Sequence, residues 1–160
     1  MLPGSWGNME RLAQTAAHVL AGATGPVPTL APDAPVLAAL ELMAARDAGV
    51  VVVLDGERIA GIVTERDYAR KVELAGQAAR DTRLAAIMTT PVIAVPPSAA
   101  LLDCARLLHE HRIHHLPVVE GGRLLGILSG HDVLEALVAA EARQLKELAT
   151  ERLLIDTGSY

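Results

Sequence analysis

Two short segments carry the residues best suited to ligand chemistry, and they nearly repeat each other. They are GIVTERD, which contains Thr64 and Asp67, and GILSGHD, which contains Ser129 and Asp132. In each, a hydroxyl residue stands three positions before an aspartate. At the start of a helix this spacing is typical of a capping box, in which both side chains satisfy backbone amides. The amides and the positive helix end also favour a phosphate, so capping and ligand binding both remain open.

Five histidines offer a second kind of chemistry, metal binding. The first two stand two positions apart in an expected helix, so they point to different faces. No acid or cysteine completes an obvious ligand set with the five. We therefore expect no metal and interpret most of them as solvated side chains. The histidines are His109, His111, His114, His115 and His131.

Neither the single cysteine nor the C-terminal Asp-Thr-Gly triplet supports an enzyme. Cys104 shares the apolar face of an expected helix with Leu101 and Leu108, so we expect it in the core. A lone cysteine excludes an internal disulfide and is typical of a reducing cytoplasm. The triplet at residues 156–158 resembles that of aspartic proteases, whose chemistry needs two such aspartates facing each other. The P-loop and Rossmann glycine patterns are absent from the sequence.

The composition describes an acidic chain with an aliphatic core. Its 160 residues are 51% hydrophobic but only 2% aromatic, and the formal net charge is -5. Because the chain has no long basic run and few aromatic residues for base stacking, nucleic-acid binding is not expected. No apolar run reaches the ~18 residues of a membrane helix, and the N-terminus does not resemble a secretory signal. These features predict a cytoplasmic protein that does not bind membranes.

Sliding the sequence along itself by 65 residues shows that the chain is an internal duplication. The apolar pattern of residues 27–72 matches that of residues 92–137 without a gap. Each copy is predicted to fold as strand, helix, strand, strand, helix. Prolines end the first strand, expected at 27–32 and 92–97, and Asp33 is the expected cap of the helix that follows in the first copy. Ser98 is the expected cap in the second.

The remaining signals divide the chain into five regions. Asp-Gly and Gly-Gly pairs predict hairpin turns between the later strands of each copy. A short helix is expected at residues 9–20, and the last helix continues to about Leu154 with a stripe that should cover an apolar surface of this chain or of a partner. The regions are an N-terminal extension (1–24), a first repeat (25–75), a connector (76–90), a second repeat (91–138) and a C-terminal helical extension and tail (139–160).

Two tandem units of this order, each ending in Gly-Ile-x-[Thr/Ser]-x-x-Asp, resemble a pair of CBS domains, named after cystathionine β-synthase. The resemblance covers residues 25–138 and includes HRIHHLPVVEGGRLLGILSGHD and IMTTPVIAV. ERDYARKV with IMTT is similar to small stand-alone bacterial CBS-pair proteins, some of them described as related to IMP dehydrogenase. The catalytic barrel of that enzyme does not fit within this length. The resemblance implies an α/β (α+β) fold in which two β-α-β-β-α repeats pack through their sheets with pseudo-twofold symmetry.

The resemblance also implies two clefts for an adenosine-containing ligand: AMP, ADP, ATP, S-adenosylmethionine or NAD(H). Asp67 and Asp132 would each accept hydrogen bonds from two ribose hydroxyls. Arg66 is the strongest phosphate candidate because its charge is permanent. The other implied ligand-binding residues are Thr64 and Ser129 beside the ribose; Pro28, Thr29, Val50, Val52, Ile93, Ala94, His115, Leu116 and Pro117 around the base; and His114, His115, His131, Lys71 and Arg112 near the phosphates.

The implied function is regulatory and not enzymatic. Ligand binding would change the angle between the two halves, or between the protomers of a homodimer, and an unknown partner protein would read the change. Protonation of His114 and His115 would make phosphate binding pH-sensitive. The alternatives are a ligand-free scaffold for dimerisation or protein interaction and, less favoured, a metal-binding module that uses the histidine cluster. An enzyme is a weaker alternative, since no nucleophile–base pair is visible.

Overall fold

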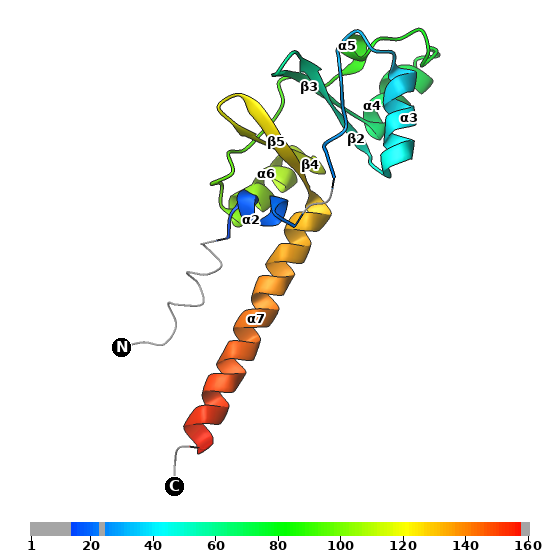
Figure 1. Cartoon of the computed structure of the whole chain (residues 1–160). Helices are drawn as coiled ribbons and strands as arrows, with labels where there is room; N and C mark the ends of the chain where they lie inside the picture. The colour runs from blue at the N-terminus through cyan, green and yellow to red at the C-terminus, as the bar shows by residue number, and fades with distance from the viewer. Residues whose placement is uncertain (1–13, 23–24, 158–160) are drawn as a thin grey trace. The chain divides into compact units, whose positions relative to one another are not determined.

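The computed structural model describes residues 14–22 and 25–157, which form two compact units (Figure 1). Within these residues, the first unit contains 14–22, 96–116 and 128–157, and the second contains 25–95 and 117–127. The division passes through the later hairpin of the second repeat. Helices and two small sheets make up the described chain, as the predicted α+β class requires.

The first repeat builds the three-stranded sheet of the second unit. β1 (Thr29–Leu30) pairs in parallel with β2 (Val50–Asp55), and β2 pairs in antiparallel with β3 (Arg58–Thr64). The first four residues of β2 are all buried, which explains why this strand is an unbroken aliphatic run.

The core of this unit lies between the sheet and α3 (Val36–Arg46). Val51 and Val53 of β2 pack in a buried cluster with residues of α3. Val50 and Val52 are also buried but do not belong to this cluster. Because successive strand residues point to opposite faces, these two valines line the face of β2 that points away from α3.

The second helix of the first repeat is short and irregular. It begins as α4 (Glu65–Tyr68), continues as the π-helical segment η1 (Ala69–Glu73), and is followed in the connector by α5 (Leu84–Ile87). The predicted helix start at Thr64 is confirmed, since Thr64 is the N-cap of α4.

The expected caps Asp33 and Ser98 are wrong. α3 begins after Pro35, and α6 (Leu101–His111) begins after Ala100, in both cases without a side-chain cap. The first amide of each helix instead donates to the backbone of a segment far away in the sequence. Backbone carbonyls thus satisfy free helix-terminal donors, and a side-chain cap is not needed. The bonds run from the Val36 N–H to the Thr82 carbonyl, 2.8 Å, and from the Leu101 N–H to the Gln14 carbonyl, 2.9 Å.

These bonds show that the segment preceding each repeat packs against the other repeat. α2 (Ala16–Leu20) lies in the first unit with α6, and the Ala16 N–H donates to the Ala99 carbonyl at 2.9 Å. In the second unit, the Leu84 N–H of α5 donates to the Ala34 carbonyl at 2.9 Å. The N-terminal extension and the connector are therefore equivalent parts of the duplication. The part of the predicted N-terminal helix before residue 14 lies outside the described residues.

The second repeat retains its hairpin but loses its first strand. β4 (His115–Glu120) and β5 (Arg123–Ser129) form a two-stranded sheet, joined by Gly121 and Gly122 with φ of 57° and 79°. Positive φ at both turn residues favours glycine. The strand expected at 92–97 is wrong: it is reduced to one parallel bridge between Val95 and Val118. Prolines at 91, 96 and 97 lack the amide donors that a longer strand needs.

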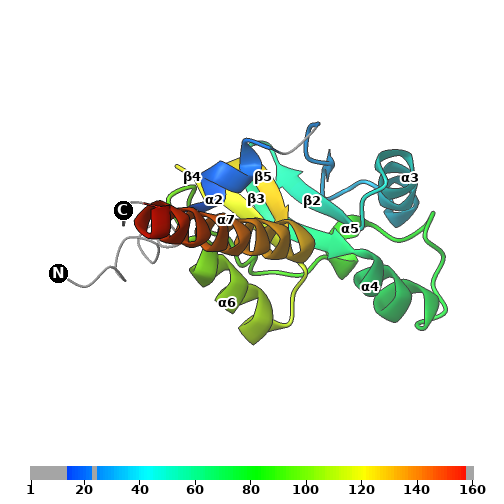
Figure 2. The ribbon, with the colours of Figure 1, turned by 90° about the horizontal axis from the view of Figure 1, so that it is seen from below.

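The last helix, α7 (Gly130–Thr157), has the length that the sequence predicts. It contacts α6 and α2 within the first unit and then extends beyond them (Figure 1, Figure 2). Cys104 is fully buried in α6, and burial raises the pKa of its thiol, which confirms it as a core residue. Within the part of the chain that the structure describes, no helix combines the length and apolar character of a membrane span.

Gly61 of β3 permits the connector to pack closely against the sheet. Ile62 and Thr89 exchange two backbone hydrogen bonds, 3.1 and 2.8 Å, so the connector runs along the edge of β3. A Cβ at position 61 would lie 2.6 Å from Sδ of Met88 and 2.9 Å from its Cβ. The glycine of this motif is therefore required by packing, and not by its backbone torsion angles.

We expect Gly61→Ala to lower the free energy of unfolding by about 1–3 kcal/mol, because the added methyl group overlaps Met88 and displaces the connector. Urea denaturation followed by circular dichroism measures the change. Gly130→Ala is the matched control: its nearest neighbour would be the His114 carbonyl oxygen at 3.9 Å. Equal stability of the two variants would contradict this account.

Candidate functional site

The first Thr-x-x-Asp motif forms a reciprocal capping box at the junction of β3 and α4. Thr64 has extended torsion angles at the end of the strand, φ -118° and ψ 167°. Its N–H donates to Asp67 Oδ2 at 3.0 Å, and the Asp67 N–H donates to Thr64 Oγ1 at 3.4 Å. The capping interpretation of this motif is therefore confirmed.

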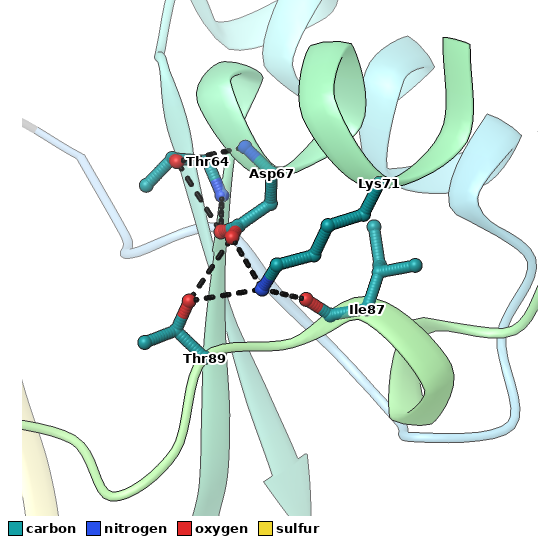
Figure 3. Close-up of polar contacts among 5 residues, drawn as sticks. All are labelled: Thr64, Asp67, Lys71, Ile87 and Thr89. Atoms are coloured by element: carbon teal, nitrogen blue, oxygen red, sulfur yellow. Dashed lines mark hydrogen bonds and ion pairs between the residues drawn. The ribbon is translucent and has the colours of Figure 1, made fainter. Parts of the chain in front are cut away.

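The other oxygen of Asp67 is held by residues that the cap does not involve (Figure 3). Lys71 Nζ lies 2.8 Å from Asp67 Oδ1, and the Thr89 hydroxyl donates to the same oxygen at 3.0 Å. Lys71 Nζ also donates to the Ile87 carbonyl at 2.8 Å and to Thr89 Oγ1 at 3.4 Å. Because Asp67 is only 8% exposed, these partners stabilise a carboxylate that burial would otherwise destabilise. We call Thr64, Asp67, Lys71, Ile87 and Thr89 the Asp67 cluster.

Sequence reasoning named Asp67 and Lys71 but missed Thr89 and Ile87. The i, i+4 spacing of aspartate and lysine indicates an ion pair on a helix, which competes with the expected phosphate contact of Lys71. Thr89 lies in the IMTT segment, 22 residues from Asp67. No local signal connects the two residues, because their contact depends on the connector running along β3.

The second motif has the same cap but lacks the surrounding cluster. The Ser129 N–H donates to Asp132 Oδ2 at 3.1 Å, and the Asp132 N–H donates to Ser129 Oγ at 3.0 Å. At the position equivalent to Lys71, the second repeat has Ala136. Asp132 is half-buried, and its Oδ1 accepts no hydrogen bond from residues 14–22 or 25–157. One carboxylate oxygen here thus has no hydrogen-bond donor within the described residues, whereas both oxygens of Asp67 are bonded.

The sheet brings together the residues expected around the base in the first repeat. Thr29 pairs with Val52 across β1 and β2, and the Val52 N–H donates to the Pro28 carbonyl at 2.9 Å. Val50 pairs with Thr64 across β2 and β3. The expected base-binding positions therefore share one three-stranded sheet, at whose end the capping box lies.

The residues expected around the second site are divided between the two units. Ile93, Ala94 and Pro117 fall in the second unit, while the Ser129–Asp132 motif falls in the first, with Leu116 and the histidines His114, His115 and His131. Within the first unit, the Gly130 N–H donates to the His114 carbonyl at 2.9 Å. The equivalent bond of the first repeat joins the Glu65 N–H to the Gly49 carbonyl at 3.3 Å, so both repeats start their second helix in the same way.

The candidate phosphate-binding cations lie on exposed positions near helix ends. Arg66 is in the first turn of α4, and His131 is in the first turn of α7 with Nε2 3.8 Å from Glu135 Oε2. Arg112 is the C-cap of α6 and has a left-handed conformation, as does the equivalent Asp47 after α3. Among the described residues, no three His, Cys, Asp or Glu side chains converge to hold a metal ion.

The family model that describes the CBS domain matches residues 18–74 and 84–139. A solved CBS-domain protein from Burkholderia ambifaria has 41% identity and a TM-score of 0.75, covering 79% of this chain and 95% of that chain. The curated protein YhcV of Bacillus subtilis is 28% identical over 69% of this chain and 78% of its own length.

The chain spans about half the length of another curated relative. This is the mitochondrial protein CBSX3 of Arabidopsis thaliana, 37% identical over 62% of this chain and 50% of its own length. The two segments matched by the family model overlap the two repeats and begin earlier than each of them. The predicted α+β fold of two tandem repeats is therefore confirmed.

The two capping aspartates should differ in their contribution to stability. Asp67→Ala removes the acceptor of the Thr64 N–H and leaves Lys71 and Thr89 without their acceptor, so we expect a loss of about 2–3 kcal/mol in unfolding free energy. Asp132→Ala removes only the acceptor of the Ser129 N–H, and we expect a loss of about 1 kcal/mol. Chemical denaturation of both variants measures the difference, and equal losses would show that the Asp67 cluster adds nothing beyond its cap.

Proposed function

Because the chain belongs to the CBS-domain family, we propose that it is a regulatory module that binds an adenosine-containing ligand and signals to a partner protein. The ligand class comprises AMP, ADP, ATP, S-adenosylmethionine and NAD(H). The observation that carries the proposal is Asp132, whose Oδ2 is fixed by Ser129 while Oδ1 has no donor within the described chain. We place the module in the cytoplasm, since a single cysteine is typical of a reducing compartment.

A ribose diol fits the chemistry of Asp132. Two adjacent hydroxyls are both donors, and a charged acceptor forms stronger hydrogen bonds than a neutral one. The cap holds the carboxylate in place, so little side-chain entropy is lost on binding. Phosphates of the ligand would lie near the start of α7, where backbone amides and the positive helix end favour negative charge.

In this proposal the first site, at Asp67, binds no ligand. Lys71 and Thr89 already occupy the oxygen of Asp67 that a ribose would need. A ligand at this site must displace the half-exposed Lys71 from a buried carboxylate, which costs free energy that binding at Asp132 does not require. We therefore propose one ligand per chain, bound through the second repeat.

Ligand binding would act by favouring one arrangement of the two halves, or of two associated chains, that the partner protein recognises. The effect is limited by the difference in ligand affinity between the arrangements. We propose no enzymatic activity. The closed Asp67 cluster favours a second candidate function, a scaffold that binds no ligand and serves protein interaction.

The ligand-binding role of Asp132 is tested first with a thermal-shift panel of AMP, ATP, NAD(H), S-adenosylmethionine and divalent metal ions. We expect a rise in Tm with an adenosine compound. With that compound, Asp132→Asn should weaken binding roughly tenfold in calorimetry, because the amide still accepts the cap bond but has lost the charge. If no compound raises Tm, the scaffold function is favoured, and if only metal ions raise it, a metal site at the histidine cluster is favoured. If calorimetry finds unchanged ligand affinity in both Asp132→Asn and Asp67→Asn, the ribose assignment is excluded.

Removing the lysine should open the first site. In Lys71→Met the Asp67 carboxylate loses its charged partner but keeps its cap, so we expect calorimetric stoichiometry to rise from about one to about two ligands per chain. Lys146→Met, which removes a lysine from the exposed part of α7, is the control and should leave the stoichiometry at one. Identical stoichiometry in the two variants would contradict the closed state of the first site.

A further inference from the structure

The extended part of α7 carries a regular stripe of exposed residues. Leu134, Val138, Leu145 and Leu148 are 60, 59, 62 and 47% exposed, which is unusual for large apolar side chains on one helix face. The spacing also places one acid and one base on the same face. We define the α7 stripe as Val138, Glu141, Leu145, Leu148 and Arg152.

The α7 stripe is not the face with which this helix packs in its own unit. α7 contacts α6 and α2, and its buried or half-buried side chains are Asp132, Val133, Ala136, Leu137, Ala140 and Gln144. At 3.6 residues per turn, this inner face lies about a quarter turn away from the stripe. From residue 145 to residue 152 every side chain is exposed. Leu145, Leu148 and Arg152 of the stripe are thus exposed to contact with another molecule.

The spacing of the stripe is that of a coiled-coil seam. Its members follow one another at intervals of three, four, three and four residues. Alternation of three and four is the pattern with which one helix packs against a second, nearly parallel or antiparallel helix. The occupant that fits this face is therefore a helix with a complementary seam.

The two charges in the seam select both the partner and its direction. In a parallel pair of identical helices, Glu141 would face another Glu141 and Arg152 another Arg152, which is unfavourable. In an antiparallel pair centred between Leu145 and Leu148, each Glu141 lies opposite an Arg152, and each Leu145 lies opposite a Leu148. The sequence is thus complementary to itself in the antiparallel direction only.

We propose that α7 pairs with α7 of a second copy of this chain as an antiparallel two-helix coiled coil. The Leu145–Leu148 contacts form the centre of the interface, and two symmetric Glu141–Arg152 pairs flank it. Burial of the leucines supplies the favourable free energy, while the charges fix direction and register. This surface is assigned independently of the proposed ligand, since it involves none of the ligand-binding residues.

Cysteine cross-linking tests the direction of the pair. In a Cys104→Ala background, a tagged Glu141→Cys chain is mixed with an untagged Arg152→Cys chain and oxidised mildly. The antiparallel pair predicts a disulfide between the two variants and none within either variant alone, because identical positions lie about 16 Å apart along the helix axis. Cross-linking of each variant with itself would indicate a parallel pair, and the absence of any cross-link would indicate that two copies do not pair through this stripe; both results overturn the proposal.

Charge reversal tests the register. We expect Glu141→Arg or Arg152→Glu alone to raise the dimer dissociation constant, measured by sedimentation equilibrium, roughly tenfold or more, since each places like charges opposite each other twice. The double variant should restore the dissociation constant of the original chain, because the opposite charges face each other again. Residues 141 and 152 are too far apart within one helix for this rescue to be intramolecular.

A control on the same helix separates pairing from net charge. Glu147→Arg changes the charge equally but lies on the side of α7 away from the stripe, and we expect it to leave the dissociation constant unchanged. Single reversals that behave like this control, or a double variant that does not recover, would overturn the proposal. Far-ultraviolet circular dichroism of each variant confirms that α7 remains helical.

Discussion

The buried carboxylate of Asp67 sets the arrangement of the second unit. A carboxylate with so little exposure requires compensating donors, and the donors come from the end of β3, from the helix that follows it, and from the connector. Meeting this requirement places Thr89 beside β3, which in turn presses Met88 against Gly61. One charge therefore explains the glycine, the threonine and the lysine of three separate segments.

The duplication preserves the backbone but not the charges of its two sites. Both repeats begin their second helix with a capping box and with an amide that bonds to the residue before β2 or β4. A cap needs only the hydroxyl residue and the aspartate, which both repeats retain. Because the first copy has Lys71 where the second has Ala136, the equivalent carboxylates of Asp67 and Asp132 make different contacts. In the first copy the carboxylate binds residues of three segments, and in the second one oxygen has no donor within the described residues.

Local chemistry was predictable from the sequence, and long-range backbone contacts were not. The repeats, the capping boxes, the hairpins and the length of α7 follow from periodicity and turn residues. Asp33 and Ser98 have the right residue types for caps, but carbonyls from segments distant in sequence satisfy the helix amides instead. The strand at 92–97 has the right apolar pattern, but its prolines cannot supply the ladder. The contact of Thr89 with Asp67 could not be predicted, because only the folded connector brings the two residues together.

α7 physically links the two proposals. Its first turn contains Asp132, and its exposed end carries the α7 stripe. If the pairing of two helices favours one position of α7 relative to the rest of its unit, and if a ligand at Asp132 favours the same position, each event must strengthen the other by the same factor. If ligand affinity does not depend on that position, pairing and binding remain independent, however tight each one is. Under the first condition, the angle of α7 at its first turn would be the variable that converts ligand occupancy into association.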